Sequence, residues 1–308
     1  LSARMMPDGP AGKGGFRAAA PRTQRFCLTC TQKALERRND RGGGASVILA
    51  VDVGNSNTTV GLFDAAGRLS FLSALETDKD KTKDRCAIDL LGVFGLYGAE
   101  IGSVDGAILS SVVPSLTATM TAAVGRLIGC SPMVVGPGIK TGLNIKAEIH
   151  NQLGSDIVAS SVAAIHKYPS PSVVIDMGTA TSMSLLKGSV YEGCILMPGL
   201  RLALEALSER AAALPPISME TAAPVPLLGR TTEDAMRSGV LYGHASMVDG
   251  MIGRMEEVAG QPVTVVATGG NAAKVLKYCT HNIIYDADLV MDGLYLLYQK
   301  NAEKHRRA

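Results

Sequence analysis

Leu49-Ala-Val-Asp52-Val-Gly54-Asn-Ser56 is the segment that decides the fold, because Val174-Ile-Asp176-Met-Gly178-Thr-Ala180 repeats its plan. Each copy reads as an apolar strand, an aspartate, one apolar residue, a glycine and small polar residues. The two aspartates are 124 residues apart. A repeat at this distance indicates an internal duplication of a whole domain.

Each copy also begins a β-hairpin. The apolar run 47–53 is followed by a turn and by the alternating strand 58–64, and the run 172–177 is followed in the same way by 182–187. Amphipathic or capped segments predict helices at 84–95, 115–128, 154–166, 200–212, 233–259, 271–280 and 289–301. Four glycines are expected to break the long segment 233–259. The sequence therefore predicts an α/β protein of two related lobes, residues 46–165 and 166–308, the second ending in a C-terminal helix.

Composition and charge exclude several partners. The chain lacks Trp and has 4% aromatic residues, which suits buried sheets and not a platform on which bases stack. Residues 1–45 hold nine Lys/Arg and three Asp/Glu, so they carry +6 and the rest carries −4 of the net +2. We expect residues 1–45 to form a disordered basic tail and the folded part to bind no nucleic acid.

The cysteines and the hydropathy pattern bear on the compartment. The six cysteines are scattered, and only Cys27 and Cys30 are close, without a second pair that would complete a zinc site. The sequence has no stretch of about 18 uninterrupted apolar residues and no apolar secretory core near its start. We therefore expect a cytoplasmic protein with no membrane partner.

The repeated hairpins carry residues suited to phosphate chemistry. Asp52 and Asp176 each place a carboxylate at a strand end, and the glycine two residues later lets a ligand approach the backbone. A carboxylate reaches a phosphate through Mg²⁺. Thr268-Gly269-Gly270 follows a further apolar strand and suits adenosine or ribose. Taken singly, each motif also reads as an ordinary hairpin or strand-to-helix turn. Together, however, two Asp-x-Gly hairpins and a strand-Gly-Gly-helix segment resemble the nucleotide-binding site of actin-like ATPases and sugar kinases.

From Val47 to about Asn301 the chain resembles the type III pantothenate kinases. Several further motifs match that family in order and spacing: Ser110-Ser-Val-Val-Pro114, Gly136-Pro-Gly-Ile-Lys-Thr-Gly142, Gly154-Ser-Asp156, Gly193-Cys-Ile-Leu-Met-Pro-Gly199, Leu214-Pro215 and Gly229-Arg-Thr-Thr232. The resemblance implies duplicated ribonuclease-H-like, actin-like ATPase domains with mixed central sheets flanked by helices. It also implies phosphorylation of pantothenate by ATP, the first step toward coenzyme A, with Mg²⁺, a monovalent cation (K⁺ or NH₄⁺) and a homodimer.

The resemblance assigns roles to residues. Asp156 is the expected general base, Asp52 the Mg²⁺ ligand and Asp176 the residue near the monovalent cation. The nucleotide is expected to contact Asp52, Gly54, Asn55, Ser56, Asn57, Gly178, Thr179, Thr181, Gly269 and Gly270. The pantothenate pocket is expected to include Gly136, Gly138, Lys140, Thr141 and Gly142, with Thr232 from the partner side.

Simpler interpretations stand beside two of these roles. Asp156 precedes a helical run, where Asp is a favoured N-cap, and Lys140 also reads as a solvated loop lysine.

The chain departs from the family pattern near the substrate. Ile157 stands where the family has an Arg after the base, and this removes a fork-shaped donor for an anion. The family usually has Asp near Ser184, Asn at Thr231 and a second Gly at Cys194, and its Thr before Leu-Pro is replaced within 211–213. Losing one Arg contact costs about 2–3 kcal/mol.

Three hypotheses follow from these residues. The first is an active pantothenate kinase, and the second is a kinase for another small alcohol on the same fold, because Ile157 alters the substrate end. The third is a nucleotide-binding paralogue that regulates partners without catalysis. Retention of both Asp52 and Asp156 favours an enzyme.

Overall fold

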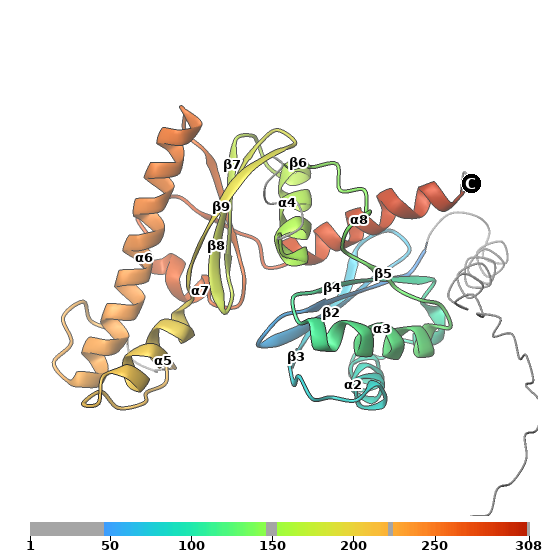
Figure 1. Cartoon of the computed structure of the whole chain (residues 1–308), viewed down its shortest axis with the longest axis horizontal. Coiled ribbons are helices and arrows are strands. Elements are labelled where there is room, and N and C mark those ends of the chain that lie inside the picture. The colour runs from blue at the N-terminus through green and yellow to red at the C-terminus, as the bar shows by residue number, and fades with distance from the viewer. Residues whose placement is uncertain (1–45, 146–152, 221–223, 307–308) are drawn as a thin grey trace, which may run out of the picture.

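The computed structural model describes residues 46–145, 153–220 and 224–306, so the predicted tail 1–45 lies outside the described residues (Figure 1). Two sheets form, in the strand orders β3-β2-β1-β4-β5 and β11-β10-β7-β8-β9-β6. The first contains β1 (Ile48–Val53), β2 (Asn57–Phe63), β3 (Leu69–Glu76), β4 (Gly106–Ser111) and β5 (Met133–Val134). The second contains β6 (Asn144–Ile145), β7 (Ser172–Met177), β8 (Ala180–Lys187), β9 (Val190–Pro198), β10 (Thr264–Thr268) and β11 (Ile284–Tyr285).

The two sheets share one plan, which confirms the predicted α/β duplication. In the first, β1 pairs antiparallel with β2 and parallel with β4, so Asp52 lies between Thr59 and Ser110. In the second, β7 pairs antiparallel with β8 and parallel with β10, so Asp176 lies between Ser182 and Thr268. Both central strands therefore end in an aspartate at the same position of the ladder.

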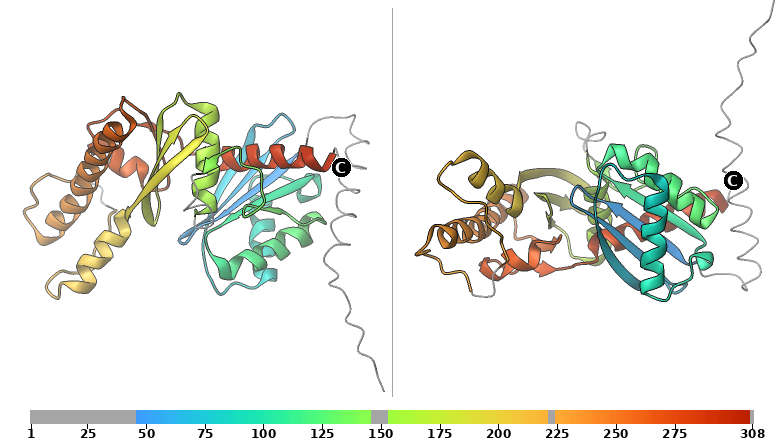
Figure 2. Two further views of the ribbon diagram at one scale, coloured as in Figure 1. Left: turned by 45° about the horizontal axis from the view of Figure 1, so that its top comes forward. Right: turned by 90° about the horizontal axis from the view of Figure 1, so that it is seen from below.

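Helices cover the outer face of each sheet (Figure 2). The helices α2 (Lys83–Leu96) and α3 (Pro114–Ile128) share a core with β1, β2 and β4. The second sheet is covered by α5 (Leu200–Arg210), α6 (Thr232–Ala259) and α7 (Ala272–Val275). Two short 3₁₀ turns, Ile101–Ser103 and Leu276–Tyr278, complete the outer layers.

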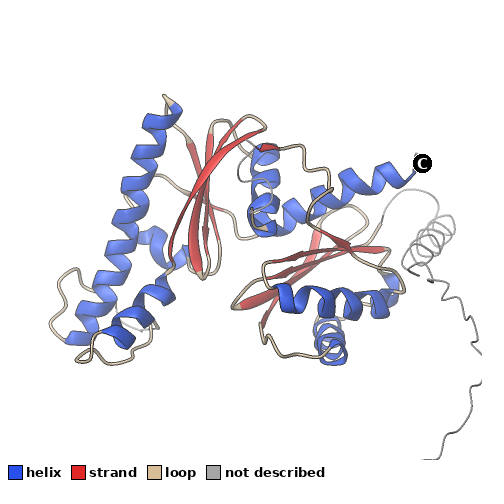
Figure 3. Cartoon of the chain, in the orientation of Figure 1, coloured by secondary structure: helices blue, strands red, loops and turns tan. Residues whose placement is uncertain are grey.

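Two helices, α4 (Ser155–Lys167) and α8 (Leu289–Arg306), lie between the sheets (Figure 3). Val162 of α4 and Leu297 of α8 share a buried cluster with Ile48 of the first sheet. The next residue of α4, Ala163, shares another buried cluster with Val174 of the second sheet. This helix pair therefore belongs to the cores of both halves and fixes one sheet relative to the other.

The chain crosses between the sheets more than once. β6 falls within the predicted first lobe, 46–165, but pairs with β9 of the second sheet. α8 falls within the predicted second lobe, 166–308, but packs on the first sheet. The division of the chain between residues 165 and 166 stays a prediction, and these two elements are exchanged across it.

Some elements differ from the sequence-based expectation. α6 runs unbroken through its four glycines, because buried residues such as Met236, Val240 and Ile252 hold it against the sheet. The predicted helix at 271–280 is instead the short α7 followed by a 3₁₀ turn. Within the part of the chain that the structure describes, no helix has the length and apolar character needed to span a bilayer.

The crossing of α4 and α8 depends on Gly293. A Cβ at this position would overlap the backbone carbonyl of Ala159 and lie 3.0 Å from the Ala159 Cα. We predict that Gly293→Ala lowers the free energy of unfolding by about 2 kcal/mol, because backbone atoms cannot move aside as a flexible side chain would. Urea denaturation measures this change.

The matched control is Gly250→Ala in α6, where a Cβ would meet nothing within 4 Å. This substitution should leave the stability unchanged or raise it by up to about 1 kcal/mol through helix propensity. Equal effects of the two substitutions would contradict the close crossing.

Candidate active site

The turns of the two repeated hairpins meet. The Ser56 hydroxyl, in the β1–β2 turn, lies 2.9 Å from the Thr179 hydroxyl in the β7–β8 turn. The aspartates at the ends of β1 and β7 are also close enough for the charge of Asp176 to raise the pKa of Asp52. The structure therefore brings both halves of the sequence repeat together.

Each turn is closed by its own backbone. The Gly54 N–H donates to the Asn57 carbonyl at 3.0 Å, and a Cβ on Gly54 would lie 2.9 Å from that oxygen. Asn55 and Asn57 are exposed. In the second turn the Gly178 N–H donates to the Ala180 carbonyl at 3.1 Å. Tight turns of this kind leave backbone N–H groups near the surface for an anion.

Asp52 lies at the centre of the site. Burial raises the pKa of its carboxyl to about 7; the Ser110 hydroxyl lowers it, and the charges of Asp156 and Asp176 raise it further. Its Oδ1 atom is buried without a hydrogen-bond partner. An unsatisfied buried carboxylate oxygen is costly unless a cation or a donor reaches it. The Asp52 Oδ1 atom is therefore suited to act as a ligand of Mg²⁺.

Asp176 occupies the equivalent place in the second sheet. Burial raises the pKa of its carboxyl to about 7, and the charge of Asp156 adds to this. Gly269 packs directly on it: its φ is +95°, and a Cβ there would lie 2.6 Å from the Asp176 Oδ1. The Asn271 side chain donates to the Gly178 carbonyl at 3.2 Å. The Thr-Gly-Gly loop is thus fixed against the second hairpin.

Asp156 is the second residue of α4 and faces the same cluster. The N-cap of the helix is Gly154, so Asp156 is not the cap itself, but its Oδ1 accepts a hydrogen bond from the Ile157 N–H at 2.8 Å. Burial raises the pKa of this carboxyl, and the N–H groups of Ile157 and Asp156 oppose the change. Asp156 is therefore not the N-cap, and its carboxyl lies near those of Asp52 and Asp176.

The first turn of α4 is bound to the first sheet. The Ser110 hydroxyl donates to the Ser155 Oγ at 2.8 Å, and the Ser111 N–H donates to the same oxygen at 3.0 Å. Ser110 and Ser155 had no role in the sequence analysis. Both belong to quoted motifs, which were their only signal, and their bond to each other is recognised only once α4 and β4 are seen together.

The number of ligand side chains that lie together limits how a metal can be held. Within the described ranges, no three His, Cys, Asp or Glu side chains are grouped closely enough to hold a metal ion by themselves. Mg²⁺ commonly takes one or two carboxylates and completes its shell with water and substrate phosphates. The orphaned Asp52 Oδ1 fits this arrangement, in which the nucleotide supplies the remaining ligands.

Other predicted residues make hydrogen bonds within the protein. Thr181 is fully buried, and its hydroxyl bonds to the His244 Nε2 at 2.9 Å. Lys140 exchanges two backbone bonds with the Asn301 side chain, at 2.9 and 3.0 Å. The Lys300 ammonium donates to the Thr141 carbonyl at 3.2 Å.

These bonds fix the loop 136–142 to α8. Gly136, Gly138 and Gly142 are exposed, and Thr232 is the exposed first residue of α6, whose N-cap is Thr231. A substrate role for these residues stays a prediction from the family motif.

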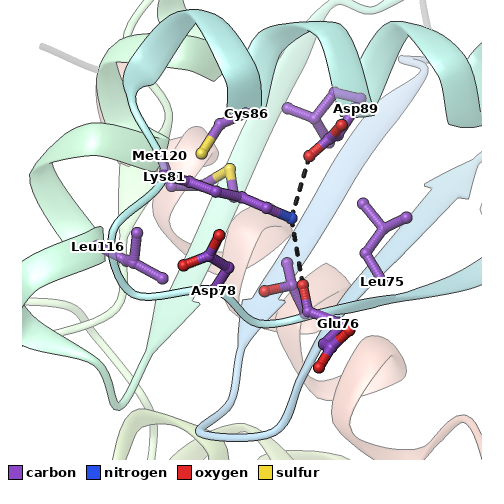
Figure 4. Close-up of a pocket in the computed structure, with 10 residues that line it drawn as sticks. Leu75, Glu76, Asp78, Lys81, Cys86, Asp89, Leu116 and Met120 are labelled. Atoms are coloured by element: carbon purple, nitrogen blue, oxygen red, sulfur yellow. Dashed lines mark hydrogen bonds and ion pairs between the residues drawn. The ribbon is translucent and has the colours of Figure 1, made fainter.

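Cavities help to locate a ligand. A cavity of about 370 Å³ borders Leu200, Leu204, Met219, Asn271 and Lys274, directly beside the second hairpin. Another, of about 20 Å³, lies behind the first hairpin, where Lys81 Nζ binds the Asp89 carboxylate at 3.1 Å and the Glu76 carbonyl at 3.3 Å (Figure 4). The smaller one holds about one water molecule. Only the larger of these two has room for a nucleobase.

Solved structures share this fold. The activator of 2-hydroxyisocaproyl-CoA dehydratase from Clostridium difficile, with bound ADPNP, has a TM-score of 0.50 at 11% identity and covers 85% of this chain and 98% of its own. Component A of the (R)-2-hydroxyglutaryl-CoA dehydratase from Acidaminococcus fermentans has a TM-score of 0.50 at 14% identity, covering 85% and 100%. Together with the paired aspartate hairpins, they define the actin-like ATPase and sugar-kinase fold.

Comparison with sequence relatives identifies the family. A family model described as type III pantothenate kinase matches residues 48–254. The type III pantothenate kinase of Geobacillus sp. is 38% identical over 84% of this chain and 99% of its own length. That of Bacillus cytotoxicus is 39% identical over 83% and 97%. The chain belongs to the type III pantothenate kinase family.

The raised pKa values predict a pH dependence of stability. In the folded protein Asp52 and Asp176 keep their protons up to about pH 7, whereas the unfolded chain loses them near the ordinary pKa of 3.8. The folded state therefore binds more protons in this range. The stability contribution is complete below pH 3.8 and is lost as the pH rises through about 7.

Asp52→Asn removes one of the two groups and tests this. At about pH 8 the variant should exceed the ligand-free parent by on the order of 2 kcal/mol, and the difference should shrink toward about pH 4. Urea unfolding at a series of pH values measures it. A difference that does not change with pH would contradict the raised pKa.

Proposed function

We propose that this protein transfers the γ-phosphoryl group of ATP to pantothenate, giving 4′-phosphopantothenate for coenzyme A biosynthesis. The observation that carries the proposal is the convergence of Asp52, Asp156 and Asp176 at the contact between the two hairpin turns. The membership of the family supports pantothenate as the substrate. Phosphoryl transfer depends on placement and on charge neutralisation, which a site assembled from two lobes can supply.

The nucleotide lies between the turns in this proposal. The N–H groups of Asn55, Ser56 and Thr179, at the turns that the Gly54 and Gly178 N–H groups close, face its phosphates, and Asp52 would hold Mg²⁺ through its unpartnered Oδ1. Mg²⁺ supplies neutralisation of the charge that develops on the phosphoryl oxygens. The base and ribose extend past Gly269 and Gly270 into the cavity of about 370 Å³ beside Asn271. Leu200, Leu204 and Met219 offer it an apolar wall.

Asp156 acts as the general base on the substrate hydroxyl. Its raised pKa moves the carboxyl toward neutral pH, where a base both is ionised and takes a proton effectively. We assign a monovalent cation to the region of Asp176, Gly178 and Thr179, because a positive charge there relieves the repulsion among the carboxylates. The loop 136–142 is the candidate site for the pantothenate chain.

A second candidate is a kinase for another small alcohol on the same fold. Ile157 favours it, because its side chain packs in a buried apolar cluster where the family has an arginine. The substrate comparison below separates the two.

Asp156→Asn tests the base. It should lower kcat for pantothenate by about 10²- to 10⁴-fold, because the amide cannot accept the proton, and leave the KM for ATP within about twofold. A coupled assay of ADP release, with Mg²⁺ and K⁺ present, measures both. The control is Asp84→Asn, which removes only an exposed ion pair with Arg126.

The outcomes separate the hypotheses. Turnover of other alcohols but not of pantothenate favours the second candidate, and nucleotide binding without turnover of any alcohol favours a regulatory paralogue. An Asp156→Asn variant as active as the Asp84→Asn control contradicts the assigned base.

We also propose a homodimer built on the α5–α6 end of the second lobe. Leu227 and Leu228 are 63% and 83% exposed and lie just before α6, and Leu202 and Leu207 of α5 are exposed as well. Apolar side chains gathered in one region support an interface between copies. Thr232 starts α6 a few residues later, so in such a dimer it lies near the partner.

Leu228→Glu should therefore convert the dimer to a monomer, because two charges would be buried in a symmetric contact. Sedimentation velocity measures the mass. The matched control is Val258→Glu at the opposite end of α6, which is 71% exposed and should leave the dimer intact. Dimers of equal stability in both variants would place the interface elsewhere.

A further inference from the structure

Three positions that depart from the family pattern converge on one buried tyrosine. The Tyr191 hydroxyl lies 3.0 Å from the Ser184 hydroxyl, and Cys194 is near enough to accept a hydrogen bond from it. Ile157 and Cys194 pack against the buried cluster to which Tyr191 belongs. Tyr191 is only 1% exposed, so this contact belongs to the interior of the protein and not to the cleft.

A β-bulge produces this arrangement. Along β8 and β9, Leu185 pairs with Gly193 and Leu186 pairs with Tyr191, so Glu192 is an extra residue in β9. Side chains alternate across a strand, and residues 191 and 194 would otherwise point to opposite faces. The extra residue turns both toward α4, and bulges often re-aim side chains beside active sites.

The cluster continues to the proposed base through Ile157. The Ile157 side chain packs against the buried cluster that contains Tyr191, and the Ile157 N–H donates to the Asp156 Oδ1 at 2.8 Å. N–H groups in the first turn of a helix have no intrahelical acceptor. The orientation of the Asp156 carboxyl therefore depends on where Ile157 is held.

We propose that Tyr191, fixed by Ser184, is a positioning residue that orients the Asp156 carboxyl through Ile157. The inference rests on the proposed function only for the role of Asp156 as base. Burial raises the pKa of the Tyr191 hydroxyl, the Ser184 hydroxyl lowers it, and Cys194 and Asp156 raise it further. The phenol thus stays neutral at the edge of the carboxylate cluster and acts by placement, without giving up a proton.

Tyr191→Phe keeps the ring and removes the bond to Ser184. In the variant the ring is less restrained, so kcat for pantothenate should fall about 10-fold or more while the KM for ATP changes little. Combined with Asp156→Asn, Tyr191→Phe should add almost nothing, because both act on the same carboxyl. The exchange rate of the Ile157 amide proton, followed by NMR without substrate, should rise in Tyr191→Phe.

Tyr242→Phe is the matched control. It also removes one tyrosine hydroxyl bond, to the Val225 carbonyl at 3.3 Å, but on α6 and away from α4. It should leave kcat and the Ile157 amide unchanged. If Tyr191→Phe does not fold, Ser184→Ala removes the same bond and is measured in the same way.

Two results overturn the inference. The first is an Ile157 amide that exchanges at the same rate in Tyr191→Phe, or in Ser184→Ala, as in the parent. The second is a kcat loss equal to that of Tyr242→Phe. The exchange measurement needs no substrate, so it decides the inference even if the parent fails to phosphorylate pantothenate, a result that would overturn only the proposed function.

Discussion

The structure depends on holding like charges together where burial and repulsion both oppose it. Burial raises the pKa of the Asp52, Asp156 and Asp176 carboxyls, and the charge of Asp156 raises the pKa of Asp52 and of Asp176 further. Such an arrangement persists only when the surrounding structure determines it strongly. Two ladders fix the strand ends, Gly54 and Gly269 permit the close approach of backbone, and the serines of β4 and α4 anchor the helix that carries the third carboxylate.

The layer formed by α4 and α8 explains how the two sheets keep this geometry. α4 presents Asp156 at its first turn and packs its next turns on both cores, so the proposed base is attached to the same helix that fixes one sheet relative to the other. β6 and α8 exchange between the halves and tie them further. A change in the relative position of the two sheets therefore also moves Asp156 relative to Asp52 and Asp176.

Much of this was predictable from local patterns. The hairpins at 47–64 and 172–187 have an alternating period and a glycine at each turn, and they place Asp52 and Asp176 correctly. The two-residue strands β6 and β11 have too few residues for a pattern, and the glycines of α6 predict breaks that packing against the sheet prevents. The contacts of Ser155 and Tyr191 could not be predicted from the sequence. Ser155 bonds to a residue 45 positions away, and the orientation of Tyr191 depends on a β-bulge.

The contact between Ser56 and Thr179 has a consequence for motion. A single bond between exposed hydroxyls contributes only about 1 kcal/mol, and water can replace it at little cost. The buried clusters of α4 and α8 hold the two halves together, so this one bond adds little resistance to separation of the two turns. The nucleotide itself must then draw the two turns together, because a triphosphate with its cations neutralises the repulsion among the three carboxylates. Once that neutralisation is lost, the nucleotide dissociates easily.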